Sequence, residues 1–117
     1  MELSLERKTV FGRTVLAVVG EVDVYSAPTL RDRLADLIES GDPTVIVDLS
    51  GVAFLDSTGL GTLVASLKLA EQRGGQLPLV CADDRILRLF RITGLDSVFT
   101  IRASVESAAE ALAPHTG

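Results

Sequence analysis

Two hydroxyl side chains stand at a strand-to-helix junction near the middle of the chain. Ser57 and Thr58 directly follow Asp56. They lie between the apolar run 45–49, which predicts a strand, and a helical pattern that opens with the turn 59–61. The first N–H groups of a helix lack intrahelical partners and the helix dipole is positive there, so an anion is favoured at this position. A phosphate would therefore have its largest effect at this position.

Each residue of this junction also has a plainer structural role. Ser57 is suited to capping the helix, and capping and accepting a phosphate are compatible roles. Gly59 and Gly61 make the first turn a surface of low relief, which a partner or a modifying enzyme can approach closely. The same two glycines would also allow the helix to pack closely on the sheet. The sequence leaves both readings of the glycines open.

The residues that enzymes need are not arranged for catalysis. The sole histidine, His115, is near the C-terminus and no G-x-S-x-G elbow surrounds Ser57, so acyl transfer is not supported. Val64 stands where a Rossmann fingerprint needs its third glycine. A phospho-aspartate receiver needs clustered acids and a late lysine, whereas the only lysines are Lys8 and Lys68. We expect no enzymatic activity, metal site or cofactor. Nucleotide binding at the glycine turn stays open as a separate hypothesis.

Length and composition fit one small globular domain. The 117 residues include four Phe, one Tyr and no Trp, so the core must be aliphatic. Cys81 is the only cysteine, which excludes an internal disulfide and suggests a core thiol. The first residues do not form a secretory signal, and no run approaches the roughly 18 to 20 apolar residues of a membrane span. We expect a cytoplasmic protein that does not enter membranes.

The net charge of −5 is concentrated in the middle third of the chain. Between residues 21 and 56 only Arg31 and Arg33 oppose the acids, which are Glu21, Asp23, Asp32, Asp36, Glu39, Asp42, Asp48 and Asp56. Such a segment repels nucleic acid, and basic and aromatic residues do not interleave elsewhere. The acids form either a solvated surface or a docking face for a basic protein.

The apolar periodicity predicts strands that alternate with helices. We expect strands over residues 3–9, 14–19, 44–49, 77–81 and 98–101. We expect four helices that begin near Ser26, at the 57–61 junction, at Asp83 or Asp84, and at Ser104. The second strand reads as buried on both faces, which leaves the first at the sheet edge. This is an α/β fold with a mainly parallel sheet of four to five strands and an N-terminal antiparallel hairpin. The domain spans residues 1–113, followed by a short tail, 114–117.

Three segments carry a resemblance to a known family. They are Gly20-Glu21-Val22-Asp23, the stretch from Val47-Asp48-Leu49-Ser50-Gly51-Val52 to Phe54-Leu55-Asp56-Ser57-Thr58-Gly59-Leu60-Gly61, and Leu89-Phe90-Arg91-Ile92-Thr93-Gly94-Leu95. In this order and spacing they resemble the STAS family, specifically the bacterial anti-sigma factor antagonists. The resemblance covers nearly the whole chain and implies the STAS fold.

The resemblance implies a phosphorylation switch. The unmodified antagonist would bind an anti-sigma factor that is a GHKL-type serine kinase, which frees a sigma factor. That kinase would phosphorylate Ser57 and release the antagonist, and a PP2C-type phosphatase would restore it. The partner-binding set carried over from the family is Glu21, Asp23, Asp56, Ser57, Thr58, Gly59, Leu60 and Gly61.

Several alternatives stay open at this point. Asp23 would match the partner-contacting acid of the family, yet it would also form a turn before Ser26. An alternative function for the chain is that of a STAS scaffold subunit in a signalling or transport assembly that controls no sigma factor. The sequence does not decide whether Thr58 is a second acceptor, or whether the free protein forms a weak homodimer.

Overall fold

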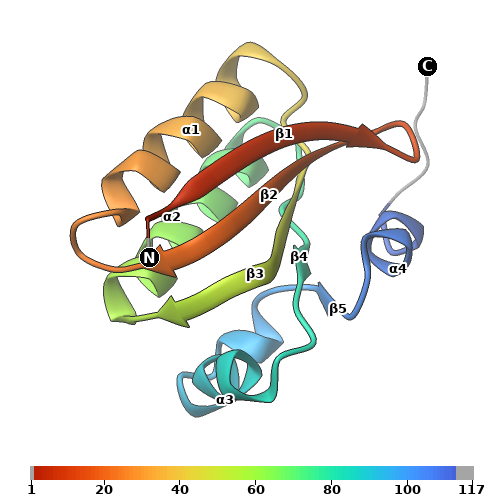
Figure 1. Ribbon diagram of the computed structural model, residues 1–117. Helices are drawn as coiled ribbons and strands as arrows, with labels where there is room; N and C mark the ends of the chain where they lie inside the picture. Colours follow the sequence, from red (N-terminus) through yellow and green to blue (C-terminus); the bar gives the residue numbers. More distant parts are fainter. Residues whose placement is uncertain (1, 113–117) are drawn as a thin grey trace.

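The computed structural model describes residues 2–112 and contains a five-stranded sheet flanked by helices (Figure 1). The predicted tail, 114–117, and His115 within it lie outside the described residues. The elements are β1 (Ser4–Val10), β2 (Arg13–Val22), α1 (Ala27–Ser40), β3 (Val45–Leu55), α2 (Ser57–Gln72), β4 (Leu79–Val80), α3 (Asp84–Ile92), the 3-10 helix η1 (Leu95–Ser97), β5 (Ile101–Arg102) and α4 (Val105–Glu110).

The strands lie side by side in chain order, from β1 to β5. β1 pairs with β2 antiparallel, and every later pair is parallel. The hairpin turns through Phe11 and Gly12, whose φ angles of 53° and 72° are both positive, as a two-residue type I′ turn requires. The predicted α/β fold, its N-terminal hairpin and its edge strand are therefore confirmed.

Two layers of apolar side chains hold the sheet between the helices. α1 and α2 cover one face, where Leu34, Leu63 and Val47 belong to the main core. α4 covers part of the opposite face, where Ala108 and Ile46 belong to a smaller cluster. Figure 1 shows α1 and α2 together on one side of the sheet, with α4 on the other.

The opposite face is covered only near the beginning of the strands. Val15 is buried beneath α4, whereas Val19, near the end of β2, is 41% exposed. The prediction that β2 is buried on both faces is wrong at this end, because α4 has six residues and is too short to extend across the sheet. An apolar run alone could not show where the covering helix stops.

β3 is longer than predicted and ends at Leu55, not at Leu49. Two register shifts against β2 lengthen it, one between Ala17 and Val19 and one between Gly20 and Glu21. Bulges of this kind interrupt the apolar pattern while the pairing continues, so the sequence pattern ends before the strand does. The extension carries the backbone directly to the Ser57 junction.

The last strand was predicted at 98–101 but is Ile101–Arg102. Val98 follows η1, and Phe99 is buried with its ring edge-on to that of Phe90. Phe99 fills the core next to α3 although it lies outside any strand. In the sequence, a buried residue of this kind cannot be told from an apolar strand residue. The strand predicted at 77–81 is paired as β4 only at Leu79–Val80.

Candidate functional site

The candidate residues gather where β2 and β3 end. Val22 pairs with Leu55, the last residues of these two parallel strands, and Asp56 N–H donates to the Val22 carbonyl across 3.2 Å. The loop 23–26 after β2 and the start of α2 after β3 therefore lie next to each other. Carboxyl ends of parallel strands are the usual place for binding sites in such sheets.

Asp56 is the residue that caps α2. It has an extended backbone (φ −105°, ψ −174°), and its Oδ1 accepts a hydrogen bond from the N–H of Gly59 across 3.0 Å. Ser57 is therefore the first residue of the helix, and the reading of Ser57 as the cap is wrong. The carboxylate replaces the hydroxyl in this role because β3 runs extended through Leu55 and the turn into the helix comes one residue earlier.

The two hydroxyl residues are left exposed at the helix start. Within residues 2–112, neither Ser57 nor Thr58 makes a side-chain hydrogen bond, and their backbone N–H groups have no acceptor. An accessible hydroxyl beside unpaired N–H groups can receive a phosphoryl group and stabilise its charge. The geometry thus leaves Ser57 free for chemistry while Asp56 holds the helix.

The two glycines of the turn have different environments. A Cβ on Gly59 would lie 2.5 Å from Leu55 Cδ1 and 2.8 Å from Val22 Cγ1, so this glycine is needed for close packing of α2 on the sheet. A Cβ on Gly61 would meet nothing within 4 Å. Of the two interpretations of these glycines, close packing of the helix on the sheet therefore applies to Gly59. Gly61 instead contributes to a surface of low relief.

Leu60 and Gly59 are placed beneath the surface, not on it. Leu60 is 5% exposed and belongs to the main core. Of the partner-binding residues that the sequence suggested on α2, the structure brings Ser57, Thr58 and Gly61 to the surface. Leu60 fixes the position of the helix that presents them.

Asp23 organises the loop that lies beside the helix start. Its Oδ1 accepts from the N–H groups of Tyr25 (2.9 Å) and Ser26 (3.0 Å), so the turn-forming role is present. The hydrogen bond from the Ser26 backbone holds the pKa of Asp23 below its ordinary value. Ser26 Oγ lies 2.8 Å from the carbonyl oxygen of Glu21, which ties the loop back to the end of β2. Glu21 itself is half-buried.

Sequence reasoning missed the apolar residues that border this site. Val24 is 57% exposed and Tyr25 is 88% exposed, both in the loop that Asp23 folds. Phe54, just before the end of β3, is 48% exposed. Tyr25 is the only tyrosine of the chain, and a tyrosine in a short polar loop was the available signal. Large exposed side chains of this kind are typical of protein-binding surfaces.

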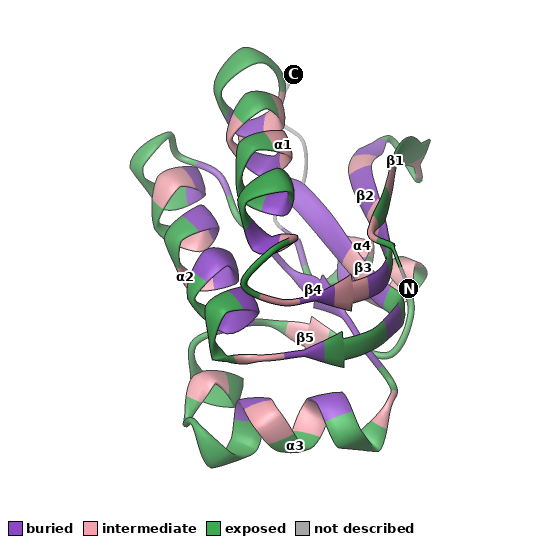
Figure 2. Cartoon of the chain, turned by 60° about the vertical axis from the view of Figure 1, so that its left-hand side comes forward, coloured by how far each residue is buried: buried purple, intermediate pink, exposed green. Residues whose placement is uncertain are grey.

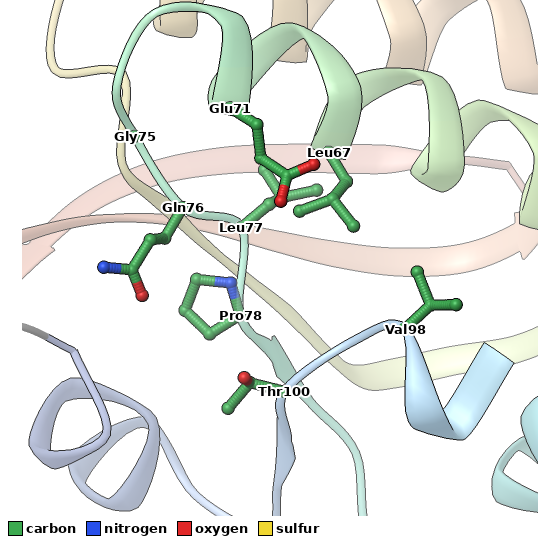
Figure 3. A pocket seen from close by; sticks show the side chains of 8 residues that line it. All are labelled: Leu67, Glu71, Gly75, Gln76, Leu77, Pro78, Val98 and Thr100. Atoms are coloured by element: carbon green, nitrogen blue, oxygen red, sulfur yellow. The ribbon is translucent and has the colours of Figure 1, made fainter.

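A separate hollow lies at the other end of α2. A pocket of about 120 Å³, open to solvent, is lined by the last turns of α2 and the approaches to β4 and β5 (Figure 3). Glu71 is the only ionisable residue among those that line it, and none of the candidate residues does so. In the described part of the chain, no three His, Cys, Asp or Glu side chains are grouped to hold a metal. These features do not compete with the Ser57 junction as a site.

Comparison with known proteins identifies the family. The STAS domain model matches residues 4–108, which include the whole sheet and every candidate residue. The chain belongs to the STAS family. An anti-sigma-B factor antagonist of Bacillus subtilis (strain 168) is 45% identical over 89 residues, which are 76% of this STAS chain and 81% of that protein.

Solved structures agree with the fold of this STAS protein. An anti-sigma factor antagonist from Mycobacterium paratuberculosis superposes with a TM-score of 0.85 at 28% identity, covering 94% of this chain and 93% of that one. The Bacillus cell fate determinant SpoIIAA, solved in its phosphorylated form, gives a TM-score of 0.68 at 21% identity, covering 93% and 97% of the two chains. At that identity the second likeness shows the fold alone.

The comparisons support anti-sigma factor antagonism as the function class of this STAS protein. Both relatives are named as antagonists of anti-sigma factors. Within residues 2–112, every helix is too short or too polar to cross a membrane.

Proposed function

We propose that this STAS protein is a cytoplasmic anti-sigma factor antagonist that works by partner switching. The unmodified chain binds an anti-sigma factor that is a serine kinase of the GHKL type, and this binding releases a sigma factor. The kinase phosphorylates Ser57 and the complex dissociates, until a PP2C-type phosphatase removes the phosphate. The observation that carries the proposal is the exposed Ser57 hydroxyl at a helix start that Asp56 already caps.

The partner binds to what we term the Ser57 face, defined by Asp23, Val24, Tyr25, Asp56, Ser57, Thr58 and Gly61. Val24 and Tyr25 supply exposed apolar area, and Asp23 and Asp56 supply negative charge around it. Apolar anchors surrounded by charge are the usual composition of a binding hot spot and its rim. The acids fit a partner with a basic surface.

The position of Ser57 explains why phosphate would act on binding and not on folding. A phosphate adds about −1.5 to −2 charges, and next to a helix N-terminus its interaction with the dipole is favourable by roughly 0.3 to 1 kcal/mol. The cap on Gly59 N–H is not disturbed, because Asp56 provides it. The folded domain therefore tolerates the modification.

The complex does not tolerate it. A dianion buried against the partner beside Asp56 costs on the order of 3 to 5 kcal/mol, because the basic side chains of the partner are already paired with Asp23 and Asp56 and leave no cation for the phosphate. That cost corresponds to roughly two to three decades of affinity. Phosphorylation therefore slightly stabilises the folded domain and strongly lowers the affinity of the complex, so the switch acts at the interface.

The relatives support this proposal. The Bacillus subtilis relative is named as an antagonist of an anti-sigma-B factor. SpoIIAA, which shares the fold, exists in a phosphorylated form. In this chain we assign the phosphate to Ser57, the hydroxyl residue that directly follows Asp56.

A kinase assay combined with a binding assay tests the proposal. The chain is incubated with candidate anti-sigma kinases, with and without ATP, and complex formation and phosphate incorporation are measured. Wild type should bind, accept phosphate and dissociate. Ser57→Ala should bind without accepting phosphate, and Ser57→Asp should keep its thermal unfolding midpoint but lose binding.

Matched controls locate the acceptor and separate the scaffold hypothesis. Thr58→Ala should behave as wild type; phosphate on Ser57→Ala would instead assign the acceptor to Thr58 or another residue. Full binding by Ser57→Asp, or a kinase that binds but never modifies the chain, would contradict the proposal and favour a STAS scaffold.

A further inference from the structure

β1 forms an edge of the sheet whose outer side has no partner among residues 2–112. All seven of its residues pair with β2 on the inner side, and five of them are exposed. Figure 2 shows β1 as a mostly exposed strand at the border of the molecule. An open edge of this length offers unpaired N–H and C=O groups to a further strand.

The hairpin turn determines which groups of β1 point outward. In a two-residue type I′ hairpin the pair that flanks the turn, here Val10 and Arg13, exchanges both backbone hydrogen bonds. Hydrogen-bonded pairs then alternate along the ladder, so the N–H and C=O groups of every second residue from Val10 face β2. The outward groups are those of Leu5, Arg7 and Thr9.

We propose that two copies of this chain associate through their β1 strands, antiparallel, with Arg7 opposite Arg7 of the second copy. A two-fold axis perpendicular to the sheet passes between these residues and joins the two sheets into one. Leu5 then exchanges backbone hydrogen bonds with Thr9 of the second copy, and Arg7 with its own counterpart. These are the residues whose backbone groups point outward.

Charge selects this register among its neighbours. With Arg7 at the centre, Glu6 stands opposite Lys8 of the second copy, and the symmetry repeats the pair. These are non-hydrogen-bonded pairs, in which side chains approach most closely. A register centred on Glu6 opposes two glutamates, and one centred on Lys8 opposes two lysines. The second copy is therefore the occupant that the charges of the edge fit.

The facing Arg7 side chains oppose the pairing and keep the dimer weak. Charged side chains on an edge strand usually prevent uncontrolled strand addition. Here the same charges disfavour the two neighbouring registers. The dimer occupies the β1 edge of both copies, so it forms without larger aggregates through that edge. The contact involves the β1 edge, while the Ser57 junction lies beyond β2 at the end of β3, and the dimer leaves that junction free.

Charge-exchange variants test the register by sedimentation velocity over a range of concentrations. Glu6→Lys and Lys8→Glu should each raise the dimer Kd about tenfold or more, since each turns two attractive pairs into repulsive ones. An equimolar mixture of the two variants should recover dimer, because both cross-strand pairs of the mixed dimer then place a lysine of one variant opposite a glutamate of the other. Arg7→Thr should lower the Kd, because it removes the like-charge contact.

The experiment can overturn the proposal in two ways. A wild-type chain that stays monomeric up to about 1 mM, beyond the range of a specific weak interface, contradicts it. So does a dimer that neither single charge variant weakens, which would place the contact elsewhere. Glu6 and Lys8 are exposed, so circular dichroism should show that the variants keep the wild-type fold.

Discussion

The Asp56 carboxylate accepts a hydrogen bond from the backbone N–H of Gly59, across 3.0 Å. Because of this contact, capping the helix and accepting a phosphate belong to two different residues, whereas the sequence allowed Ser57 to do both. Asp56 fixes the start of α2, and Ser57 contributes no side-chain hydrogen bond to the fold among the described residues. A reversible modification can therefore use Ser57 without first breaking the helix cap.

We predict that Asp56→Ala destabilises the domain by about 1 kcal/mol, the usual effect of losing an N-cap. Asp56→Asn should lower the free energy of unfolding much less, because its side-chain oxygen still accepts a hydrogen bond from Gly59 N–H. Urea denaturation of the two variants measures the difference. Equal loss in both would show that the charge of Asp56, and not the cap, supports the fold.

Gly59→Ala and Gly61→Ala should have opposite effects on stability. The new Cβ at position 59 would press on Leu55 and Val22, at a cost of about 1 to 3 kcal/mol. At position 61 it meets open space, so alanine should stabilise the helix by about 0.5 to 1 kcal/mol. Chemical denaturation of the pair provides its own control. Destabilisation by both substitutions would refute the distinction.

Much of the fold could be predicted because local signals coincided. The Asp83 and Ser104 caps each combine a capping residue with an apolar stripe, and the helix that starts after Ser26 combines such a stripe with a proline, Pro28, in its first turn. The errors share a cause. The end of β3 depends on bulges against β2, and the exposure of Val19 depends on how far α4 extends. Both are properties of pairing and packing over distance, which a local pattern does not contain.

The candidate site was predictable in its position but not in its division of roles. The Asp56-Ser57 pair was found from the motif, yet which residue caps the helix depends on where β3 stops. Tyr25 was missed because nothing in the sequence indicates that the loop after β2 lies beside the start of α2. Only the parallel pairing of Val22 with Leu55 brings the two segments together.

Asp23 should titrate below the ordinary range of an aspartate. The hydrogen bond from Ser26 N–H stabilises its ionised form, so the pKa in the folded protein is lowered. Its contribution to stability is then complete above the unfolded pKa of about 3.9 and is lost as the pH falls through the lowered folded value. NMR titration of the carboxyl carbon measures this midpoint.

The corresponding stability experiment uses Asp23→Asn, which keeps an oxygen acceptor but does not titrate. The difference in unfolding free energy between wild type and this variant should shrink as the pH falls below about 3.9. Asp83, whose pKa is lowered by Arg85, contributes in the same direction and is present in both proteins. A difference that grows with acidification would show that the sign is wrong.

Tyr25→Ala should weaken binding to the anti-sigma partner by about 2 kcal/mol, or roughly thirtyfold, if Tyr25 is the apolar anchor of the Ser57 face. The side chain is almost fully exposed, so the free energy of unfolding should change by no more than about 0.5 kcal/mol. Ile92→Ala is the matched control, because Ile92 is also highly exposed but lies on α3, outside the Ser57 face. Calorimetric titration of both variants with the partner decides the matter. Equal losses would show that Tyr25 is no more important for binding than Ile92, and no loss from Tyr25→Ala would remove the loop after β2 from the interface.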